Sequence, residues 1–392
     1  MGIDIRQIVN RAELEACYDL WGAVFNEGRA FFQQRLDADR TYRLDTTWAA
    51  WVDGVMAAAI QIFPFWVRYG VATVRVAGIG SVATRPEYRH RGLAQAILRQ
   101  QLSWMKAHDY PLALLYTHLP GFYAQLGWIP FREGESYRYL PGQVLAEKAP
   151  PISVDVGDLG RDAPVLRAIY DDFSAQVPFS RVRSAAFWED MRRWTATSNM
   201  TVFIAKMGEA PVGYLLARER PTWQEPAIEC AYTARGQHSA LPLLQAYLRH
   251  SHRTAPLTLR LPKGHALARY GTPTSDASGA MWRLVLPLSA LQQLQPEFNR
   301  RWLAEPTAVS TALALAVGSQ ILCCFDASPD GLDIRAQDCG RLSAEAIVSL
   351  TDAQCAALLL FGADPQSPAF SHRLFQILFP PTVPFLWDLD HF

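Results

Sequence analysis

The sequence lacks an excess of charge of either sign, because 37 Lys and Arg residues are balanced by 37 Asp and Glu residues among 392. A dedicated nucleic-acid-binding protein needs a basic excess to displace counterions from phosphates, so nucleic acid is not expected as a partner. No apolar run reaches the ~18 residues of a membrane helix, so a membrane is not expected either. The first residues, MGIDIRQIVNRAELEA, carry charges where a signal peptide has its apolar core. These absences favour a cytoplasmic protein.

Cysteine is scarce, and the six cysteines are scattered along the chain. The adjacent pair Cys323 and Cys324 is expected in a core. The spacing of the six fits neither a metal site nor a disulfide framework, so we expect a reduced protein without a metal. Apolar residues are abundant instead, at 50% against 19% charged residues, which is enough to form sizeable cores. A chain of this length corresponds to roughly two to four domains.

The first part of the chain alternates between the strand and helix patterns of an α/β protein. Apolar segments bounded by turn signals predict strands at 48–52, 55–65, 71–83 and 112–116. Helical periodicity predicts helices at 11–32, 92–108 and 121–126. Asp53 and Gly54 separate the first two strands, and this pair is a strong signal for a two-residue hairpin.

The order of elements partly recurs between residues 150 and 290, as a weak internal repeat of one α/β unit. The last hundred residues differ and predict a small antiparallel sheet. A helix follows at Thr351, where Gln354 completes a capping box, and a second helix spans about 370–378. The final segment, 384–392, is too apolar for a free tail and should be docked on the protein.

The most informative segment, residues 81–94, predicts a strand, a basic turn and the start of a long helix. The unpaired N–H groups and the dipole of a first helical turn attract phosphate, and Gly92 lets a pyrophosphate approach the backbone. Arg89, His90 and Arg91 add positive charge. The alternative interpretation is a plain turn glycine flanked by solvated arginines.

A second motif, residues 117–128, predicts a strand exit, a short helix that carries Tyr123, and a Gly-Trp pair. With this motif, residues 71–131 resemble the acetyl-CoA-binding half of a GNAT-superfamily N-acetyltransferase. The whole chain resembles the enhanced intracellular survival (Eis) family. That resemblance implies an α/β (α+β) protein of tandem GNAT folds, with mixed, mostly antiparallel sheets flanked by helices, and a sterol carrier protein-like domain. The implied domains are an N-terminal acetyltransferase domain at 1–147, a degenerate second GNAT domain at 148–290 and the carrier-like domain at 291–392.

The resemblance implies acetyl-CoA as co-substrate and assigns residues to it. The cofactor-contacting positions implied are Val82, Ala83, Thr84, Arg89, His90, Arg91, Gly92, Leu93, Ala94, Gln95, His118 and Leu119. Tyr123 matches the general acid that protonates the leaving thiolate, and a phenol within hydrogen-bond reach can supply that proton. The alternative for Tyr123 is a helix residue that merely packs beside Phe122.

The central strand carries no carboxylate between Ala77 and Ala83, so a base must come from elsewhere. Eis-type proteins use the C-terminal carboxylate, which here belongs to Phe392. Burial raises the low pKa of such a group. Asp388, Asp390 and His391 are nearby alternatives, and a simple hydrophobic anchor is another interpretation of the tail.

The resemblance also implies two residues of the acceptor pocket, Glu27 and Ser81. Ser81 replaces a residue that is aromatic in some relatives, which would reshape that pocket.

The function expected from the sequence is transfer of acetyl from acetyl-CoA to a primary amine by direct attack in a ternary complex, without a metal. The acceptor is a small polyamine-like molecule, an aminoglycoside or a lysine side chain. The alternative is a carrier of an apolar ligand with a CoA-responsive GNAT domain, and longer acyl chains also remain open. The resemblance implies a homo-oligomer, a hexamer.

Overall fold

The N-terminal part is built on a long apolar hairpin, formed by β3 (Val55–Tyr69) and β4 (Ala72–Thr84). The computed structural model describes residues 2–131, 133–195, 200–219, 225–275, 278–306, 309–336, 339, 343 and 346–391. The eight-stranded sheet has the order β1-β2-β3-β4-β5-β15-β6, and β9 pairs with β3. Its other strands are β1 (Ile3–Gln7), β2 (Thr47–Val52), β5 (Leu112–Tyr116), β6 (Ile129–Pro130), β9 (Ser180–Arg181) and β15 (Ala280–Leu284). Asp53 and Gly54 have φ values of 48° and 84°, which confirms the predicted hairpin between β2 and β3.

Helices cover both faces of this sheet, because successive strand residues point to opposite sides. The helices are α1 (Arg11–Val24), α2 (Arg29–Ala38), α3 (Leu93–Ala107) and α4 (Pro120–Ala124). α1 and α2 pack on Ala49 and Ala59, whereas α3 packs on Ala50 and Ile60 from the other side. The single helix predicted over 11–32 is therefore wrong. It is broken after α1, where Phe25 is extended and Gly28 takes a φ of 76°.

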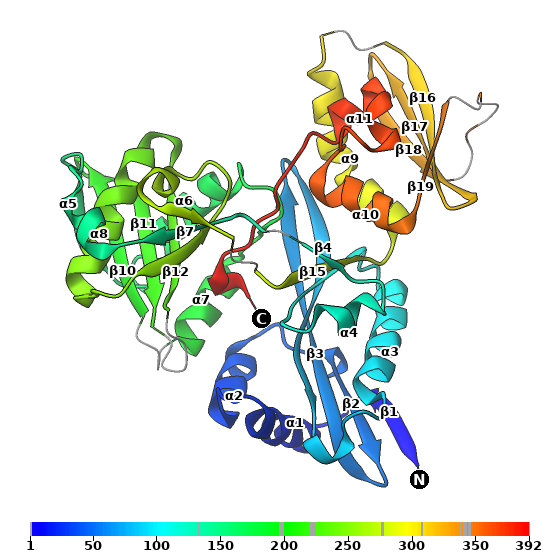
Figure 1. Ribbon diagram of the computed structural model, residues 1–392, viewed down its shortest axis with the longest axis horizontal. Helices are drawn as coiled ribbons and strands as arrows, with labels where there is room; N and C mark the ends of the chain where they lie inside the picture. The colour runs from blue at the N-terminus through cyan, green and yellow to red at the C-terminus, as the bar shows by residue number, and fades with distance from the viewer. Residues whose placement is uncertain are drawn as a thin grey trace.

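The second unit, to the left in Figure 1, contains two sheets. A four-stranded sheet has the order β12-β11-β10-β8, and a three-stranded sheet has the order β13-β7-β14. The strands are β7 (Glu135–Tyr139), β8 (Ser153–Gly157), β10 (Met200–Met207), β11 (Ala210–Arg218), β12 (Ala227–Tyr232), β13 (Leu257–Leu261) and β14 (Thr272–Thr274). The helices are α5 (Pro141–Ala146), α6 (Ala163–Ser174), α7 (Ala185–Trp194) and α8 (Ala240–Ser251).

The two units exchange strands. β15 comes from the later part of the chain but lies in the N-terminal sheet, where Met281 pairs with Leu115 of β5. β7 follows directly from the N-terminal unit but pairs with β13 and β14 of the second unit. The predicted boundary between residues 147 and 148 therefore does not separate the two sets of sheets.

The C-terminal unit comprises α9 (Pro287–Leu303), a sheet of order β18-β17-β16-β19, and two further helices. The remaining elements are β16 (Thr311–Val317), β17 (Gln320–Ser328), β18 (Gly331–Ala336), β19 (Ile347–Leu350), α10 (Asp352–Phe361) and α11 (Arg373–Leu378). The capping box predicted at Thr351 is confirmed. The sheet is mixed instead of antiparallel, because β19 returns to pair parallel with β16.

Cys324 and Cys339 form a disulfide in this unit, which corrects the expectation that the cysteines form no such bond. Their Cα atoms are 5.3 Å apart, and Cys339 lies beyond the end of β18. The two cysteines meet only through the fold, which their spacing along the sequence does not reveal. Cys323 is buried, as expected for the core.

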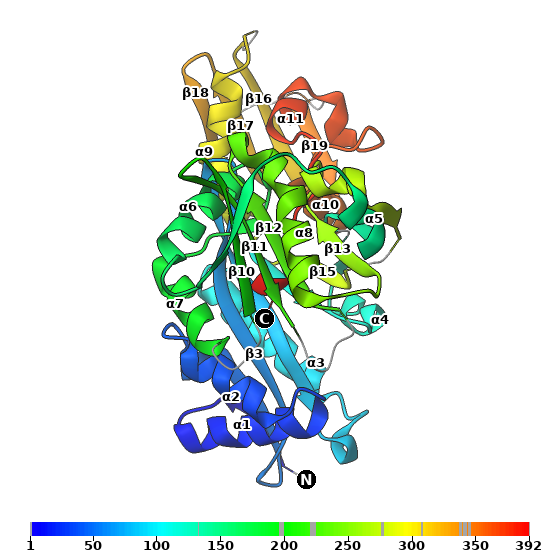
Figure 2. The ribbon, with the colours of Figure 1, turned by 90° about the vertical axis from the view of Figure 1, so that its left-hand side faces the viewer.

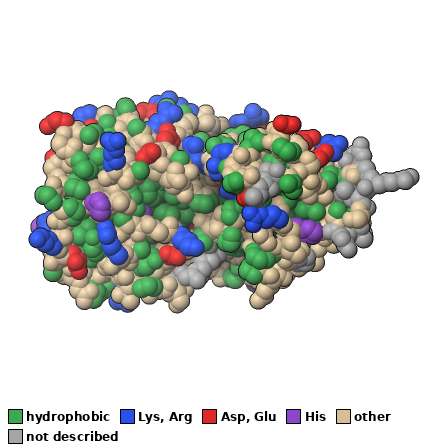
Figure 3. Space-filling view, turned by 90° about the horizontal axis from the view of Figure 1, so that it is seen from above, with side chains coloured by type: hydrophobic (Ala, Val, Ile, Leu, Met, Phe, Trp, Pro, Cys, Tyr) green, Lys and Arg blue, Asp and Glu red, His purple; other side chains and the backbone are tan. Residues whose placement is uncertain are grey.

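The C-terminal segment leaves the C-terminal unit and ends near the centre of the molecule, where the other two units meet (Figures 1 and 2). Phe385, Trp387 and Leu389 are buried in the core of the second unit, so the predicted docking is confirmed for residues 385–391. Across the part of the chain that the structure describes, no helix is long and apolar enough to cross a membrane. Acidic, basic and hydrophobic side chains are interspersed on the face in Figure 3.

Candidate active site

A fork opens between β4 and β5 in the N-terminal sheet. The two strands pair in parallel from Val76 and Leu112 to Ile79 and Leu115, and no further pair follows. β4 runs on to Thr84 and stays paired with β3 on its other side. The backbone of Val82–Thr84 therefore faces the fork along its unpaired edge. This is the segment that the resemblance assigns to the pantetheine arm.

Ser81 marks the start of the fork. Its φ is 54°, a left-handed value that is uncommon for serine. The β3–β4 register shifts between Ala59 and Gln61, directly opposite this point. Such a bulge twists a strand and turns its edge away from its neighbour. Ser81 thus lies where the strands begin to diverge.

The basic turn and the start of α3 lie directly after the fork. Arg89, His90, Arg91 and Gly92 are exposed. Gly92 is the N-cap of α3 with a φ of 74° and makes no side-chain cap, so the first N–H groups of the helix lack a capping side chain from this residue. Arg91 donates to the carbonyl of Glu87 at 3.1 Å and thereby tightens the turn. A helix start with this charge is suited to a phosphate group.

Several predicted residues share one apolar cluster on the α3 side of the sheet. Tyr123 is buried there with Leu93, and Val82 and Ala94 pack against the cluster. Gln95, in the first turn of α3, donates to Gln125 at 3.1 Å, which connects the start of α3 to the end of α4. The structure therefore brings together the turn, the fork strand and the tyrosine helix. His118 and Leu119 are exposed on the connection from β5 to α4.

Tyr123 is held in place by ring contacts. Its ring meets Phe122 edge-on at 4.9 Å between centroids and Trp128 at 6.5 Å. Burial raises the pKa of its phenol to about 12, so the hydroxyl is protonated at neutral pH. Such a group is a neutral O–H donor that can hydrogen-bond to a thiolate forming beside it and supply the proton that the thiolate takes up.

The docked tail reaches the opposite side of the fork. His391 stacks on Tyr116, the last residue of β5, with ring centroids 3.7 Å apart. Asp390 is held by Arg183, which is itself fully buried and also binds Glu229. Phe392, the predicted base, lies outside the described residues, so its role stays a prediction. Of its alternatives, Asp390 is already paired with Arg183, and Asp388 with Arg260.

Glu27 lies between α1 and α2 and is half-buried. Within the described ranges it makes no hydrogen bond or ion pair that fixes its orientation. No group of three metal-binding side chains occurs in the described part of the chain.

Tyr116 and Glu133 are site residues that sequence reasoning missed. The Tyr116 hydroxyl donates to Oε1 of Glu133 at 3.0 Å, and Glu133 is buried. The only signal in the sequence was an acidic residue two positions after Phe131, in a strand-rich segment. Its buried position depends on the strand exchange, which places Arg260 of β13 nearby.

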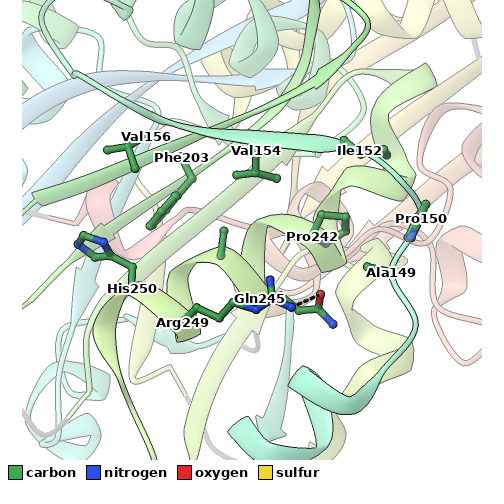
Figure 4. A pocket seen from close by; sticks show the side chains of 11 residues that line it. Ala149, Pro150, Ile152, Val154, Val156, Phe203, Pro242, Gln245, Arg249 and His250 are labelled. Carbon is green, nitrogen blue, oxygen red and sulfur yellow. Dashed lines mark hydrogen bonds between the residues drawn. The ribbon is translucent and has the colours of Figure 1, made fainter.

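A separate open groove of about 610 Å³ lies on the second unit, between α8 and the strands β8 and β10. Val154 and Val156 point into it from β8, Phe203 from β10, and His250 from α8 (Figure 4). None of the residues predicted to bind acetyl-CoA or the amine lines it, so it is distinct from the fork.

A known protein family and several solved structures are similar to this chain. Residues 4–131 match the family model described as an acetyltransferase (GNAT) domain. No curated protein sequence matches the chain. A GCN5-related N-acetyltransferase from Anabaena variabilis shares the fold over 100% of both chains, with a TM-score of 0.74 and 16% identity. A probable N-acyltransferase from Enterococcus faecalis has a TM-score of 0.73 and 16% identity over the same full coverage.

Eis1 from Mycobacterium abscessus also covers 100% of both chains, with a TM-score of 0.65 and 18% identity. At these identities the solved structures establish the fold alone. The match over residues 4–131 is to a GNAT acetyltransferase domain, and together with the neighbours it supports an acyltransferase enzyme. Enzymes of this kind take an acyl-CoA and an amine acceptor.

Proposed function

We propose that the protein is an acetyl-CoA-dependent N-acetyltransferase of the Eis type that acetylates a primary amine by direct attack. The single observation that carries the proposal is the fork between β4 and β5, with a basic helix start at one end and buried Tyr123 beside it. The unpaired edge of Val82–Thr84 suits the amide groups of pantetheine. The N-terminus of α3 suits the pyrophosphate.

In the proposed reaction the amine nitrogen attacks the thioester carbonyl and forms a C–N bond. Collapse of the tetrahedral intermediate breaks the C–S bond and expels the CoA thiolate. The Tyr123 hydroxyl gives its proton to that sulfur, while the amine nitrogen loses one proton to a base. The base proposed is the terminal carboxylate of Phe392, with His391 as the alternative in the same segment.

The whole-chain proposal follows the same resemblance. Residues 148–290 would be a degenerate GNAT domain without a CoA site, and 291–392 a sterol carrier protein-like domain. The mixed sheet of the C-terminal unit, covered by α9–α11, supports the latter. The acceptor proposed is a small polyamine-like molecule, an aminoglycoside or a lysine side chain, and the assembly a hexamer.

The proposal is tested by adding one residue after Phe392. The extension moves the terminal carboxylate but leaves the fork intact. Acetyl-CoA should raise the melting temperature of wild type and extended protein alike, whereas CoA release with an amine should fall at least about 100-fold in the extended protein. Equal rates would contradict the role of Phe392. Absence of a thermal shift with acetyl-CoA, but a shift with a fatty acid, would contradict the enzyme proposal as a whole.

A further inference from the structure

Glu133 is a buried carboxyl group that the proposed reaction does not yet use. Its side chain is 3% exposed, between the short strand β6 and the strand β7. Oε1 accepts a hydrogen bond from the Tyr116 hydroxyl at 3.0 Å. Oε2 is buried and has no hydrogen-bond partner among the described residues. An ionised carboxylate in this state is costly, so a structural role alone does not account for it.

Among the described residues, Glu133 forms no direct ion pair. Tyr116 faces it from β5, Arg260 from β13, and Asp388 from the tail. Arg260 forms its ion pair with Asp388 and lies 3.3 Å from Nε2 of His391. Burial, as the largest effect, raises the pKa of Glu133 to about 7, although Arg260 and Tyr116 act in the opposite direction. The carboxyl group therefore exchanges a proton near neutral pH.

The hydrogen bond to Tyr116 connects this carboxyl group to the fork. Tyr116 is the first residue of β5 beyond the last pair with β4, and it pairs with Ala280 of β15 on its other side. Its ring is stacked on His391, next to the residue proposed to carry the base. The Tyr116 hydroxyl thus links Glu133, through one hydrogen bond, to the residue at which β4 and β5 diverge.

We propose that Glu133 is a positioning residue that receives, through the Tyr116 hydroxyl, the proton that an ammonium acceptor loses before attack. The proposed Phe392 base takes the second proton, which the nitrogen loses after attack. The inference rests on the proposed acetyl transfer and deepens it on the acceptor side. The ammonium N–H gives its proton to the Tyr116 oxygen as the Tyr116 O–H gives its own to Oε1 of Glu133. The products are a neutral amine, an unchanged phenol and a neutral carboxylic acid, so protons and charge balance.

This relay indicates the class of acceptor. An alkyl primary amine arrives protonated at neutral pH and must lose a proton before it can attack. A carboxylate whose pKa is raised toward neutrality accepts that proton more readily than an ordinary one. An aromatic amine arrives neutral and does not need the relay. The structure therefore assigns this side of the fork to alkyl amines, such as polyamines and lysine side chains.

The test compares kcat/KM against pH for wild type, Glu133→Gln, Glu133→Asp and Tyr116→Phe. The acceptor is whichever of spermidine, kanamycin and Nα-acetyl-lysine gives the fastest CoA release with wild type. Wild-type kcat/KM should rise with pH through about 7. Glu133→Gln and Tyr116→Phe should each abolish this rise and lower kcat at least about tenfold, with little change in KM. The double variant should lose no more than either single one, and Glu133→Asp should restore part of the pH-dependent rise.

The chain offers a matched control. Tyr137 donates to Glu135 at 2.7 Å on β7, which repeats the tyrosine–glutamate pair away from the fork. Glu135→Gln and Tyr137→Phe should keep the wild-type rate and pH profile. If Glu133→Gln and Tyr116→Phe also keep it, the proposal is overturned. The proposal is also overturned if His391→Phe removes the rise of kcat/KM with pH while Glu133→Gln and Tyr116→Phe keep it.

A second measurement does not depend on the acceptor. The infrared difference spectrum between wild type and Glu133→Gln should show a carboxylic acid carbonyl band that disappears as pH rises through about 7. Tyr116→Phe should shift that band. If no such band titrates near neutrality, the inference fails even when acetyl transfer is observed. If the band titrates but wild type releases no CoA with any amine, the proposed function fails instead.

Discussion

At the scale of residues, burial sets the protonation states of two groups beside the fork, Tyr123 and Glu133. Burial raises the pKa of Tyr123, so its hydroxyl stays protonated at neutral pH and can serve as the proposed donor. Glu133 is buried beside a tyrosine, and its raised pKa brings it near half-ionisation at neutral pH. Tyr123 and Tyr116, the hydrogen-bond partner of Glu133, lie on opposite faces of the sheet, since Tyr123 packs with α3 whereas Tyr116 packs with the C-terminal core. The proposed acid and the proposed proton acceptor are thereby kept apart.

The raised pKa of Glu133 has a consequence for stability. The folded protein binds this proton more tightly than the unfolded chain, so the stabilisation is complete below the ordinary pKa of 4.5 and is lost as pH rises through about 7. Glutamine does not ionise and does not incur this loss. Between about pH 5 and about pH 9, the unfolding free energy of Glu133→Gln should therefore gain on the order of 3 kcal/mol relative to wild type. Urea unfolding at both pH values measures the difference in unfolding free energy between Glu133→Gln and wild type. If that difference is the same at both pH values, the raised pKa assigned to Glu133 is contradicted.

At the scale of elements, the start of α3 combines a left-handed backbone conformation at Gly92 with the helix end that is proposed to bind the pyrophosphate. Gly92 has a φ of 74°, and a Cβ built on it meets nothing within 4 Å. A substitution there strains the backbone but causes no clash. The open space in front of Gly92 is the place that the proposed pyrophosphate needs.

Gly92→Val should therefore raise the KM for acetyl-CoA about tenfold, because a branched side chain at positive φ costs about 1–2 kcal/mol and occupies the approach to the helix end. Gly208→Val is the matched control. Gly208 has a φ of 62° and open space, but it lies in the β10–β11 turn of the second unit. Gly208→Val should lose a similar free energy of unfolding, but its KM for acetyl-CoA should stay at the wild-type value. Equal KM values for both variants would contradict the assignment of this helix end.

The sequence predicts local elements well where their signals are local. The hairpin at Asp53 and Gly54, the strand at 112–116 and the capping box at Thr351 all depend on neighbours in sequence, and each is confirmed. The break after α1 was missed because apolar positions continue across it. Partners that meet only through the fold were also missed, such as Glu133 with Tyr116 and Cys324 with Cys339.

At the scale of the whole molecule, the three units are joined through buried side chains and exchanged strands. Arg183 lies in the second unit and binds both Glu229 and Asp390 of the tail, with all three side chains fully buried. Arg181 and Arg35 hold the carbonyls of Asp390 and His391. The end of the chain is therefore fixed by contacts from α2 and from the second unit.

Arg183→Met should destabilise the protein by about 3–5 kcal/mol, because it leaves two buried carboxylates without a partner. The tail should become sensitive to carboxypeptidase, and acetyl transfer should fall because the chain end is no longer held at the fork. A triple variant that also carries Glu229→Gln and Asp390→Asn should recover much of the stability but not the activity. Full activity in either variant would contradict the importance of tail position.

The strand exchange predicts how fragments behave. A fragment of residues 1–147 lacks β15, which lies between β5 and β6, and it carries β7 without partners. It should therefore be poorly folded, with weak near-ultraviolet circular dichroism. Residues 1–131 joined through a flexible linker to 278–286 should show stronger tertiary signals. A well-folded 1–147 fragment would show that the N-terminal unit does not need the exchanged strand.

The central claim is that Tyr123 protonates the leaving thiolate at a fork that binds acetyl-CoA. The measurement that tests it most directly is kcat of Tyr123→Phe at saturating acetyl-CoA, with the acetyl-CoA dissociation constant measured alongside. The account predicts a kcat at least about 100-fold below wild type and a dissociation constant within about twofold, because only the transferred proton is lost. A kcat equal to that of wild type would contradict it.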